Sequence, residues 1–442
     1  MSLLIKNGIL VTMNNAREVI KADILVQQDR IVEIASQIDQ PAQQVIDAHD
    51  MLVIPGLIQA HVHLCQALFR GCADDMELLD WLKLRIWPLE GSHDPDSLYY
   101  SALLGCAECL RAGSTAIIDM GTVHHSDSIF HAVQSSGIRY LGGKCLMDSG
   151  SQVPATLLDH SDNAINESMD LYQRWNGKGE GRIHYALCPR FALSCSESLL
   201  KQIQQLSVNY QIPIHSHASE NLEEVRAVQQ MTGMRNIAYL DKLGILSDKL
   251  ILAHCIHLDE KEKEMLCCSK TNISHCPTAN LKLASGIARI PELLAGGARV
   301  ALGSDGPPCN NNLNLFQEMR LAALIQKPQY GPSSMPAEKV FELATLGGAQ
   351  AMGLDKEIGS LEKGKKADIV LVKLGGWHTQ PLAAARVYTQ LVYQARSDDV
   401  YCTIVNGKIL MQDSRLTTID ERELRAGVED SFSRVARRSG II

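Results

Sequence analysis

The chain has 442 residues, of which 45% are hydrophobic and 21% are charged, and its formal net charge is −8. This composition is that of a globular protein and excludes a chain that is mainly disordered. The excess of negative charge, without any run of Lys and Arg, argues against nucleic acid or an anionic membrane as a partner.

The N-terminal sequence lacks the uninterrupted apolar core of a signal peptide, and no stretch reaches the roughly 18 apolar residues of a transmembrane helix. The 13 cysteines are an odd number spread along a long chain. A secreted disulfide scaffold is short and rich in Cys. We therefore expect reduced thiols and a cytoplasmic protein.

The first ~55 residues have the pattern of β-strands separated by short polar breaks. Residues 3–11 predict a strand, a turn at Asn7-Gly8 and a second strand. Further strands are expected at residues 22–26 and 30–34. This spacing is typical of a small antiparallel sheet.

From residue 57 to about residue 350, short apolar runs alternate with helix-like segments, which predicts a parallel sheet with crossover helices. The expected strands include residues 116–119, 182–187, 212–217, 250–254 and 300–305. Several of them end in His or Asp. In a barrel of such strands, the catalytic side chains collect at the C-terminal strand ends.

The β pattern returns near residue 359, and we expect its strands to join the N-terminal sheet. The last ~25 residues have the pattern of an amphipathic helix. The predicted fold class is α/β, with a (β/α)8 TIM-like barrel inserted in a small discontinuous β-sandwich domain. The expected boundaries are 1–56 and 359–417 for the small domain, 57–358 for the barrel and 418–442 for a C-terminal helix.

His61 and His63 follow an apolar run and are two residues apart, so both imidazoles would face the same side of a strand. Alone, this spacing indicates a metal site only weakly. His215 and His217 repeat the spacing on a later strand, and two further expected strands end in His254 and Asp305. Imidazoles and carboxylates seldom finish apolar strands without a partner, so the set together predicts a metal site.

The order of these motifs resembles the amidohydrolase superfamily. The motifs are Pro55-Gly56-Leu57 with His61-x-His63, then His217-x-x-Glu220, Ala253-His254-Cys255 and Gly303-Ser304-Asp305-Gly306. The resemblance covers nearly the whole chain. It implies the barrel-plus-sheet architecture and a small heterocyclic substrate.

The resemblance also implies a role for each residue. The metal ligands would be His61, His63, His217 and Asp305. His254 would hydrogen-bond the attacking water, Glu220 would shuttle protons to the substrate ring, and Asp305 would accept the proton of the water. His215 falls outside this set, and structural support is the role that we expect for it.

Relatives with two metals bridge them with a carboxylated Lys on the fourth barrel strand. The expected fourth strand, residues 182–187, contains no Lys, which favours one divalent metal per chain. Three His and one Asp suit Zn²⁺, and Fe²⁺ remains an alternative.

Within the superfamily, the chain is most similar to deaminases of 5′-deoxyadenosine, S-adenosylhomocysteine and methylthioadenosine. The supporting segments are residues 71–75, 81–82, 86–90, 280–287 and 310–316. This resemblance implies release of ammonia from the adenine ring of such nucleosides, adenosine included. It also implies that Glu90 accepts hydrogen bonds from the ribose hydroxyls. Residues 65–90 would form a lid, in which Trp81 and Trp87 either stack on the base or pack the lid.

Two positions depart from the nucleoside deaminases. Arg190 stands where they commonly have His, and its Pro-Arg-Phe context resembles guanine deaminase. An Arg suits a carbonyl or ring-nitrogen acceptor. Lys144 lies where S-adenosylhomocysteine deaminases have Arg, and we count it with Glu90, Arg190 and Trp87 as a candidate substrate-binding residue. The exact roles of Lys144 and of His124-His125 stay open.

Three alternatives therefore remain. The first is a deaminase of a free oxopurine or pterin such as guanine, 8-oxoguanine or isoxanthopterin, and the second is a triazine chlorohydrolase or aminohydrolase. The third is a non-catalytic assembly protein, which is disfavoured because every metal ligand is retained. The sequence does not decide whether the chain forms a homo-oligomer.

Overall fold

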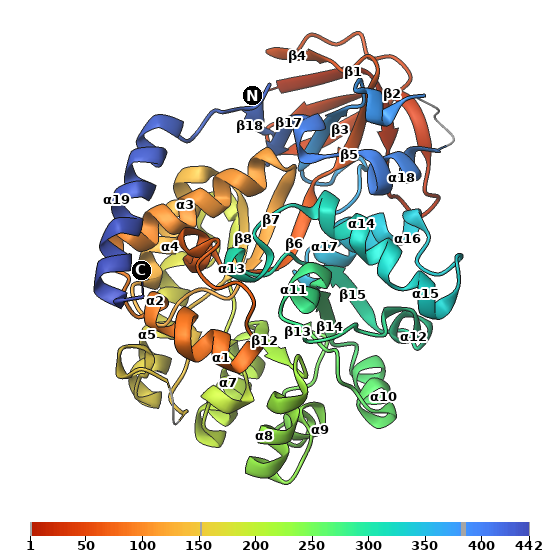
Figure 1. Cartoon of the computed structure of the whole chain (residues 1–442). Coiled ribbons are helices and arrows are strands. Elements are labelled where there is room, and N and C mark those ends of the chain that lie inside the picture. Colours follow the sequence, from red (N-terminus) through yellow and green to blue (C-terminus); the bar gives the residue numbers. More distant parts are fainter. Residues whose placement is uncertain (1, 151–152, 382–385, 442) are drawn as a thin grey trace.

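The computed structural model describes residues 2–150, 153–381 and 386–441 (Figure 1). It confirms the predicted α/β class, because a barrel of parallel strands surrounded by helices is joined to a separate β-sheet domain. Figure 1 shows the sheet domain at one end of the molecule, where strands from the N-terminal part of the chain lie beside strands from the C-terminal part.

The barrel strands follow one another in chain order and pair in parallel. They are β6 (Leu57–Val62), β7 (Ser114–Asp119), β8 (Arg139–Gly142) continued by β9 (Cys145–Leu146), β10 (Ile183–Tyr185) continued by β11 (Cys188–Pro189), β12 (Ile214–Ala218), β13 (Leu250–His254), β14 (Asn272–His275) and β15 (Arg299–Leu302). Isolated bridges between Val62 and Asp305 and between Leu187 and Ile214 close the ring. This is the arrangement of a (β/α)8 barrel.

Helices cover the outside of the barrel, and several of them begin with capping residues. Asp94 accepts a hydrogen bond from the backbone N–H of Ser97 and so starts the longest of these barrel helices, and Asn221 and Asp259 begin α8 and α10 in the same way. The main covering helices are α3 (Pro95–Arg111), α4 (Ser126–Ser136), α5 (Ser161–Trp175), α7 (Glu197–Tyr210), α8 (Leu222–Thr232), α9 (Asn236–Lys242), α10 (Glu260–Ser269), α12 (Ile290–Ala295), α14 (Leu315–Ile325) and α16 (Ala337–Glu342).

Among the residues that the structure describes, the small domain is one hydrogen-bonded sheet of nine strands with a hydrophobic cluster of its own. Antiparallel pairing of β5 with β16 joins its two parts. The strands are β1 (Ser2–Val11), β2 (Val19–Gln27), β3 (Arg30–Ala35), β4 (Gln44–Asp47), β5 (Met51–Pro55), β16 (Ile369–Lys373), β17 (Val400–Val405), β18 (Lys408–Gln412) and β19 (Arg415–Leu416).

The predicted turn at Asn7-Gly8 is wrong. Residues 2–11 form the single strand β1, and the pairing register with β2 shifts between Ile5 and Gly8. Asn7 has a φ of 63°, which is the left-handed conformation that Asn tolerates better than most residues. The Asn-Gly pair therefore marks a bulge in one strand rather than the turn of a hairpin.

A buried ion pair ties the barrel to the sheet domain. The Nε and Nη2 atoms of Arg139, at the start of β8, lie 2.8 and 2.9 Å from the two carboxylate oxygens of Asp368. Asp368 precedes β16, and its carboxylate also accepts a hydrogen bond from the backbone N–H of Asn406. Burial alone would lower the pKa of Arg139, but the charge of Asp368 raises it overall.

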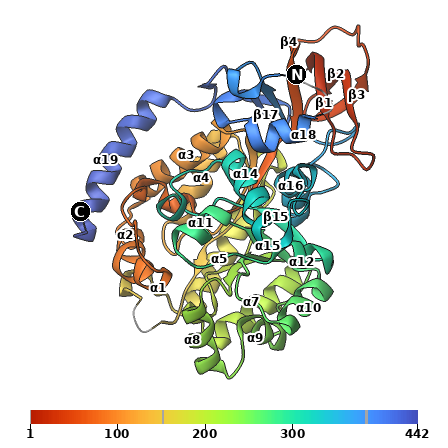
Figure 2. The same cartoon turned by 45° about the vertical axis from the view of Figure 1, so that its right-hand side comes forward.

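The C-terminal helix α19 (Glu421–Ser439) runs along the outside of the barrel beside α3 (Figure 2). Arg434 and Arg438 near its end pair with Asp94, the residue that begins α3. Within the described ranges, none of the helices has both the length and the apolar character needed to cross a membrane.

The segment after the first barrel strand folds as four short helical pieces. These are a 3-10 helix (Leu64–Phe69), α1 (Leu78–Trp81), a π-helical turn (Leu82–Ile86) and α2 (Trp87–Glu90). Leu78, Trp81 and Leu82 from this segment line a small pocket at the C-terminal ends of the barrel strands. The segment thus occupies the place of a lid.

Candidate metal and active site

Four side chains with metal-ligating atoms converge at the C-terminal ends of three strands. His61 lies in β6 and His63 directly follows it, His217 lies in β12, and Asp305 follows β15. One side-chain nitrogen from each of His61, His63 and His217 lies within 4.8 Å of the other two. The Oδ1 atom of Asp305 lies 3.2 Å from His61 Nε2 and 3.5 Å from His63 Nε2.

Hydrogen bonds behind the cluster set the tautomers of two of the imidazoles. His215 Nδ1 faces the carbonyl oxygen of Asp119 at 3.4 Å, so His215 Nε2 accepts the proton of His61 Nδ1, which is 2.8 Å away. His217 Nδ1 donates to the carbonyl oxygen of Arg190 at 2.6 Å. His61 and His217 therefore each direct an unprotonated Nε2 atom into the cluster.

The cluster fits a divalent metal. The buried Nε2 atom of His61 has no hydrogen-bond partner among the described residues. A buried polar atom without a partner destabilises the fold unless a ligand binds it. Burial, reinforced by the neighbouring imidazoles, holds the pKa values of His63 and His217 well below the ordinary range, so both are neutral. Burial would raise the pKa of Asp305, but contact with His61 keeps it well below its ordinary value. Neutral imidazoles and an ionised carboxylate are the protonation states that metal binding requires.

Glu220 and His254 form a second pair beside the metal ligands. Glu220 Oε2 lies 3.4 Å from His254 Nε2, and His254 Nδ1 donates to Asn280 Oδ1 at 2.8 Å. Burial raises the pKa of Glu220 to about 7. Burial opposes the charged form of His254, but the carboxylates of Glu220 and Asp305 raise its pKa overall. The pair can therefore exchange a proton near neutral pH.

The backbone is strained where the strands deliver these side chains. Ser219, His254 and Asp305 have φ angles of 55°, 73° and 62°, and none of them is glycine. Left-handed backbone at non-glycine residues costs free energy and persists where the surroundings hold it, often at functional sites. Here it turns the chain sharply at the ends of β12, β13 and β15.

The pocket over the cluster is narrow. Its lining consists of His63, Gln66, Leu78, Trp81, Leu82, Arg190, Phe191, His217, Glu220, Glu224, His254, Leu283 and Asp305. Its free volume of about 30 Å³ is small for a heterocyclic substrate. We therefore expect the residues of the lid to move when a substrate binds.

The predicted substrate-binding residues do not all reach this pocket. Arg190 lines it, whereas Glu90 lies behind Arg190 and forms an ion pair with it. Trp87 is buried outside the lining, and Trp81 takes the place facing the pocket. Lys144 is also buried outside the lining, where Asp159 and Glu167 neutralise its ammonium group. The structure thus gives no support to a substrate contact by Lys144, because its charge is already paired.

Sequence reasoning missed three side chains at the site. Gln66 lines the pocket, Asn280 orients His254, and the Ser285 hydroxyl lies 3.5 Å from Glu220 Oε1. Asn280 and Ser285 stand in a segment that carried the family resemblance, which was the only signal for them. Gln66 follows His63 by three residues, and nothing in the periodicity separates it from a lid residue.

A further group of possible ligands consists of His63, Cys65 and Glu90. It does not suit a metal, because Glu90 is held by Arg190. In addition, burial raises the pKa of the Cys65 thiol well above its ordinary value, so the thiolate that would bind metal is not formed.

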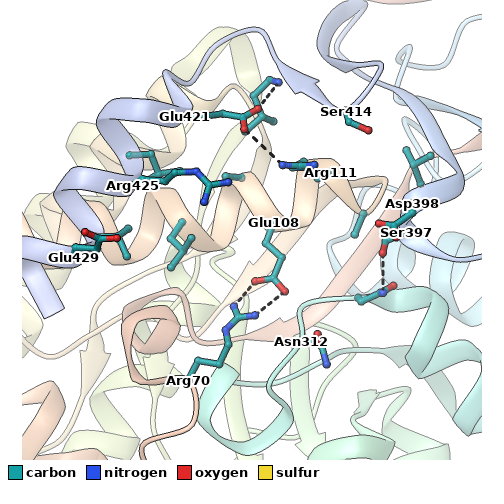
Figure 3. Close-up of a pocket in the computed structure, with 18 residues that line it drawn as sticks. Arg70, Glu108, Arg111, Asn312, Ser397, Asp398, Ser414, Glu421, Arg425 and Glu429 are labelled. Atoms are coloured by element: carbon teal, nitrogen blue, oxygen red, sulfur yellow. Dashed lines mark hydrogen bonds and ion pairs between the residues drawn. The ribbon is translucent and has the colours of Figure 1, made fainter. Parts of the chain in front are cut away.

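A larger cavity of about 550 Å³ lies between α19 and α3, away from the metal ligands (Figure 3). Figure 3 shows two ion pairs among its charged side chains, Arg70 with Glu108 and Arg111 with Glu421. No His or Cys lines it among the described residues. This cavity therefore offers no imidazole or thiol ligand for a metal.

Comparison with known proteins agrees with the geometry. The model of the amidohydrolase family matches residues 52–410. A 5-methylthioadenosine/S-adenosylhomocysteine deaminase of Moorella thermoacetica is 38% identical over 413 residues, which cover 92% of this chain and 94% of that protein. A 5′-deoxyadenosine deaminase of Methanobrevibacter smithii is 35% identical over 425 residues, which cover 96% and 95%.

Solved structures share the whole architecture. An adenosine deaminase from Xanthomonas campestris with bound zinc superimposes with a TM-score of 0.91 at 29% identity and covers 98% of both chains. Guanine deaminase from E. coli superimposes with a TM-score of 0.83 at 27% identity, covering 93% of this chain and 98% of that one.

Proposed function

The chain belongs to the amidohydrolase family and is a hydrolase acting on carbon–nitrogen bonds, and we propose that it deaminates the adenine ring of 5′-deoxyadenosine-like nucleosides. The class of substrates comprises 5′-deoxyadenosine, S-adenosylhomocysteine, methylthioadenosine and adenosine. The observation that carries the proposal is the placement of Glu220, with a pKa raised to about 7 by burial, beside a cluster of metal-ligating side chains. Full-length relatives named for these substrates support it.

One divalent metal per chain would be held by His61, His63, His217 and Asp305. Three imidazoles and a carboxylate suit Zn²⁺, and the Xanthomonas campestris structure contains zinc. When bound, such a metal supplies a water molecule of lowered pKa, so that hydroxide is available near neutral pH.

The residues around the ligands supply the proton transfers. Glu220 protonates the ring nitrogen next to the carbon that carries the amine, which makes this carbon open to attack by water. Asp305 accepts the proton of the attacking water, and the hydrogen bond from His254 stabilises the oxygen that adds to the carbon. The carbon–nitrogen bond then breaks, and the amine leaves as ammonia after it has received a proton.

The cellular setting is part of the proposal. All thirteen cysteines are free thiols, and ten of them are buried. Such a distribution is expected of a protein that stays in the reducing cytoplasm.

A panel of substrates tests the proposal. Metal-replete protein is incubated with 5′-deoxyadenosine, S-adenosylhomocysteine, methylthioadenosine, adenosine, guanine, 8-oxoguanine and isoxanthopterin, and ammonia release is followed by a coupled assay. We expect turnover of the adenine nucleosides. Turnover confined to the free oxo-bases would overturn the proposed substrate class while leaving the hydrolase intact.

One observation favours a second candidate, a deaminase of a free oxopurine or pterin. Arg190 lines the pocket, and its guanidinium can donate to a carbonyl oxygen that adenine lacks. The oxo-bases of the panel decide between the two candidates.

A further inference from the structure

The carboxylate of Glu90 is fully engaged by protein donors. Arg190 Nη1 lies 2.6 Å from Glu90 Oε2, and Arg190 Nη2 lies 3.2 Å from Oε1. Gln66 Nε2 donates to the same Oε1 atom at 2.7 Å. All three side chains are buried. Breaking a buried bidentate ion pair of this kind costs much free energy, because each charge would be left without a partner.

Two of these three residues line the pocket, and Glu90 is the one that does not. Gln66 and Arg190 line the pocket together with His63, His217 and Asp305, whereas Glu90 is absent from the lining. The orientation of Gln66 follows from chemistry, because only its amide nitrogen can face a carboxylate. Its Oε1 atom therefore points away from Glu90 toward Gly306, and this buried atom has no partner among the described residues.

We propose, on the basis of the proposed function, that Glu90 is a positioning residue that holds Arg190 and Gln66 in place. Arg190 and Gln66 then contact the substrate, and Glu90 does not bind the sugar hydroxyls. Arg190 offers N–H donors to the pocket, and Gln66 Oε1 offers an acceptor beside them. The pocket thus selects a substrate that presents a nitrogen or oxygen acceptor to Arg190 and an N–H or O–H donor to Gln66.

The pairing of Glu90 with Arg190 also links substrate binding to a metal ligand. The carbonyl oxygen of Arg190 accepts the Nδ1 proton of His217 at 2.6 Å, and the Arg190 side chain is fixed by Glu90. Loss of the Glu90 charge therefore releases a residue whose backbone orients a metal ligand. We expect kcat to fall as well as KM to rise, and the effect should be the same for every substrate.

A pair of substrates distinguishes positioning from sugar binding. Adenosine carries both ribose hydroxyls, and 2′,3′-dideoxyadenosine carries neither, while their bases are identical. If Glu90 does not touch the hydroxyls, the kcat/KM values of the wild type for the two compounds differ by no more than about 5-fold, below the loss expected for breaking a charged hydrogen bond. A larger preference for adenosine would overturn the proposal, and this measurement needs no variant.

The variant Glu90→Gln, measured with the same two substrates, gives a second test. We expect it to lower kcat/KM for both compounds by the same factor, so that their ratio is unchanged. A loss confined to adenosine, with 2′,3′-dideoxyadenosine unaffected, would show that Glu90 binds the hydroxyls. Glu108→Gln serves as the control, because it breaks an Arg–Glu pair with Arg70 that is more exposed and lies outside the pocket.

Further measurements distinguish failure of the role assigned to Glu90 from failure of the proposed function. Gln66→Leu, which removes the unpaired acceptor, should raise KM for both compounds, and an unchanged KM would overturn the assignment of Gln66. Absence of turnover on every adenine nucleoside, with metal bound, would instead overturn the substrate class. Turnover with a strong preference for the hydroxyls would overturn only the role assigned to Glu90.

Discussion

The Nε2 atom of His254 lies 3.4 Å from the Oε2 atom of Glu220, and both side chains are buried. His254 is the last residue of β13, and Asn280 fixes its ring from behind, which holds the imidazole in place for this contact. Because burial raises the pKa of Glu220 to about 7, its carboxyl group can give and regain a proton near neutral pH. This makes Glu220 the acid whose loss should affect chemistry without affecting metal binding.

We predict that Glu220→Gln retains the wild-type metal content, measured by elemental analysis, and loses turnover by a factor on the order of 10²–10⁴. The amide keeps the shape of the side chain but cannot deliver a proton. Glu223→Gln, three residues further along and exposed, is the control and should keep wild-type turnover. Turnover of Glu220→Gln close to that of the wild type would exclude the assigned role.

The second prediction concerns His215, which accepts the Nδ1 proton of His61. Replacing it with Phe removes this acceptor, so the imidazole of His61 loses the bond that fixes its tautomer and orientation. We expect the affinity for metal to fall roughly 10–100-fold. Competition with a chelator measures this loss independently of activity. His131→Phe on the exposed side of α4 is the control, and equal chelator resistance in the two variants would refute the role of His215.

Much of this site could be predicted from sequence, because side chains at the ends of parallel strands gather at one end of a barrel whatever the details of packing. His61, His217, His254 and Asp305 follow that rule. The pairing of Glu90 with Arg190 could not be predicted. It joins residues 100 positions apart, one in the lid and one after a strand, and no periodicity relates them. The carboxylate that resembled a sugar ligand is thereby turned toward a neighbouring cation.

Lys144 shows the same limit for a charged residue. The sequence offered a basic side chain at a position associated with substrate binding, but the fold surrounds its ammonium group with Asp159, Glu167 and the carbonyl oxygen of Val123. These partners come from different segments of the chain. Burial of a charge depends on such partners, and a single sequence does not reveal them.

A third prediction concerns pH and Glu318 of α14. Burial raises the pKa of this carboxyl group from 4.5 to about 7, although Thr278 and Asn310 donate hydrogen bonds to it. Since the folded-state pKa is above the unfolded one, its favourable contribution is fully present below about pH 4.5 and is lost as the pH rises through 7. Wild-type stability should therefore fall between pH 5 and pH 8 partly because of this group.

In Glu318→Gln this loss should disappear. We expect the free energy of unfolding in urea to fall less between pH 5 and pH 8 than in the wild type, by roughly 3 kcal/mol. The exposed Glu223→Gln variant should follow the wild-type pH dependence. Parallel curves for wild type and Glu318→Gln would show that the carboxyl group titrates normally.

The last prediction concerns Gly306, the residue after the metal-ligand candidate Asp305. Its φ of −77° and ψ of 144° suit any residue, so alanine there causes no backbone strain. A methyl group at this position would instead collide with the Oε1 atom of Gln66. We expect Gly306→Ala to fold but to lower kcat/KM about 10-fold or more, because Gln66 must leave its place between Glu90 and the pocket.

The cause of that loss can be isolated in a second background. In Gln66→Ser the shorter side chain does not reach Gly306, so adding Gly306→Ala should cost almost nothing further in kcat/KM. An equal loss in both backgrounds would mean that the methyl group acts on something other than Gln66. The remaining neighbour, His63 Cβ, would be at an ordinary contact distance of 3.6 Å, so that outcome would point to a shift of Asp305 itself.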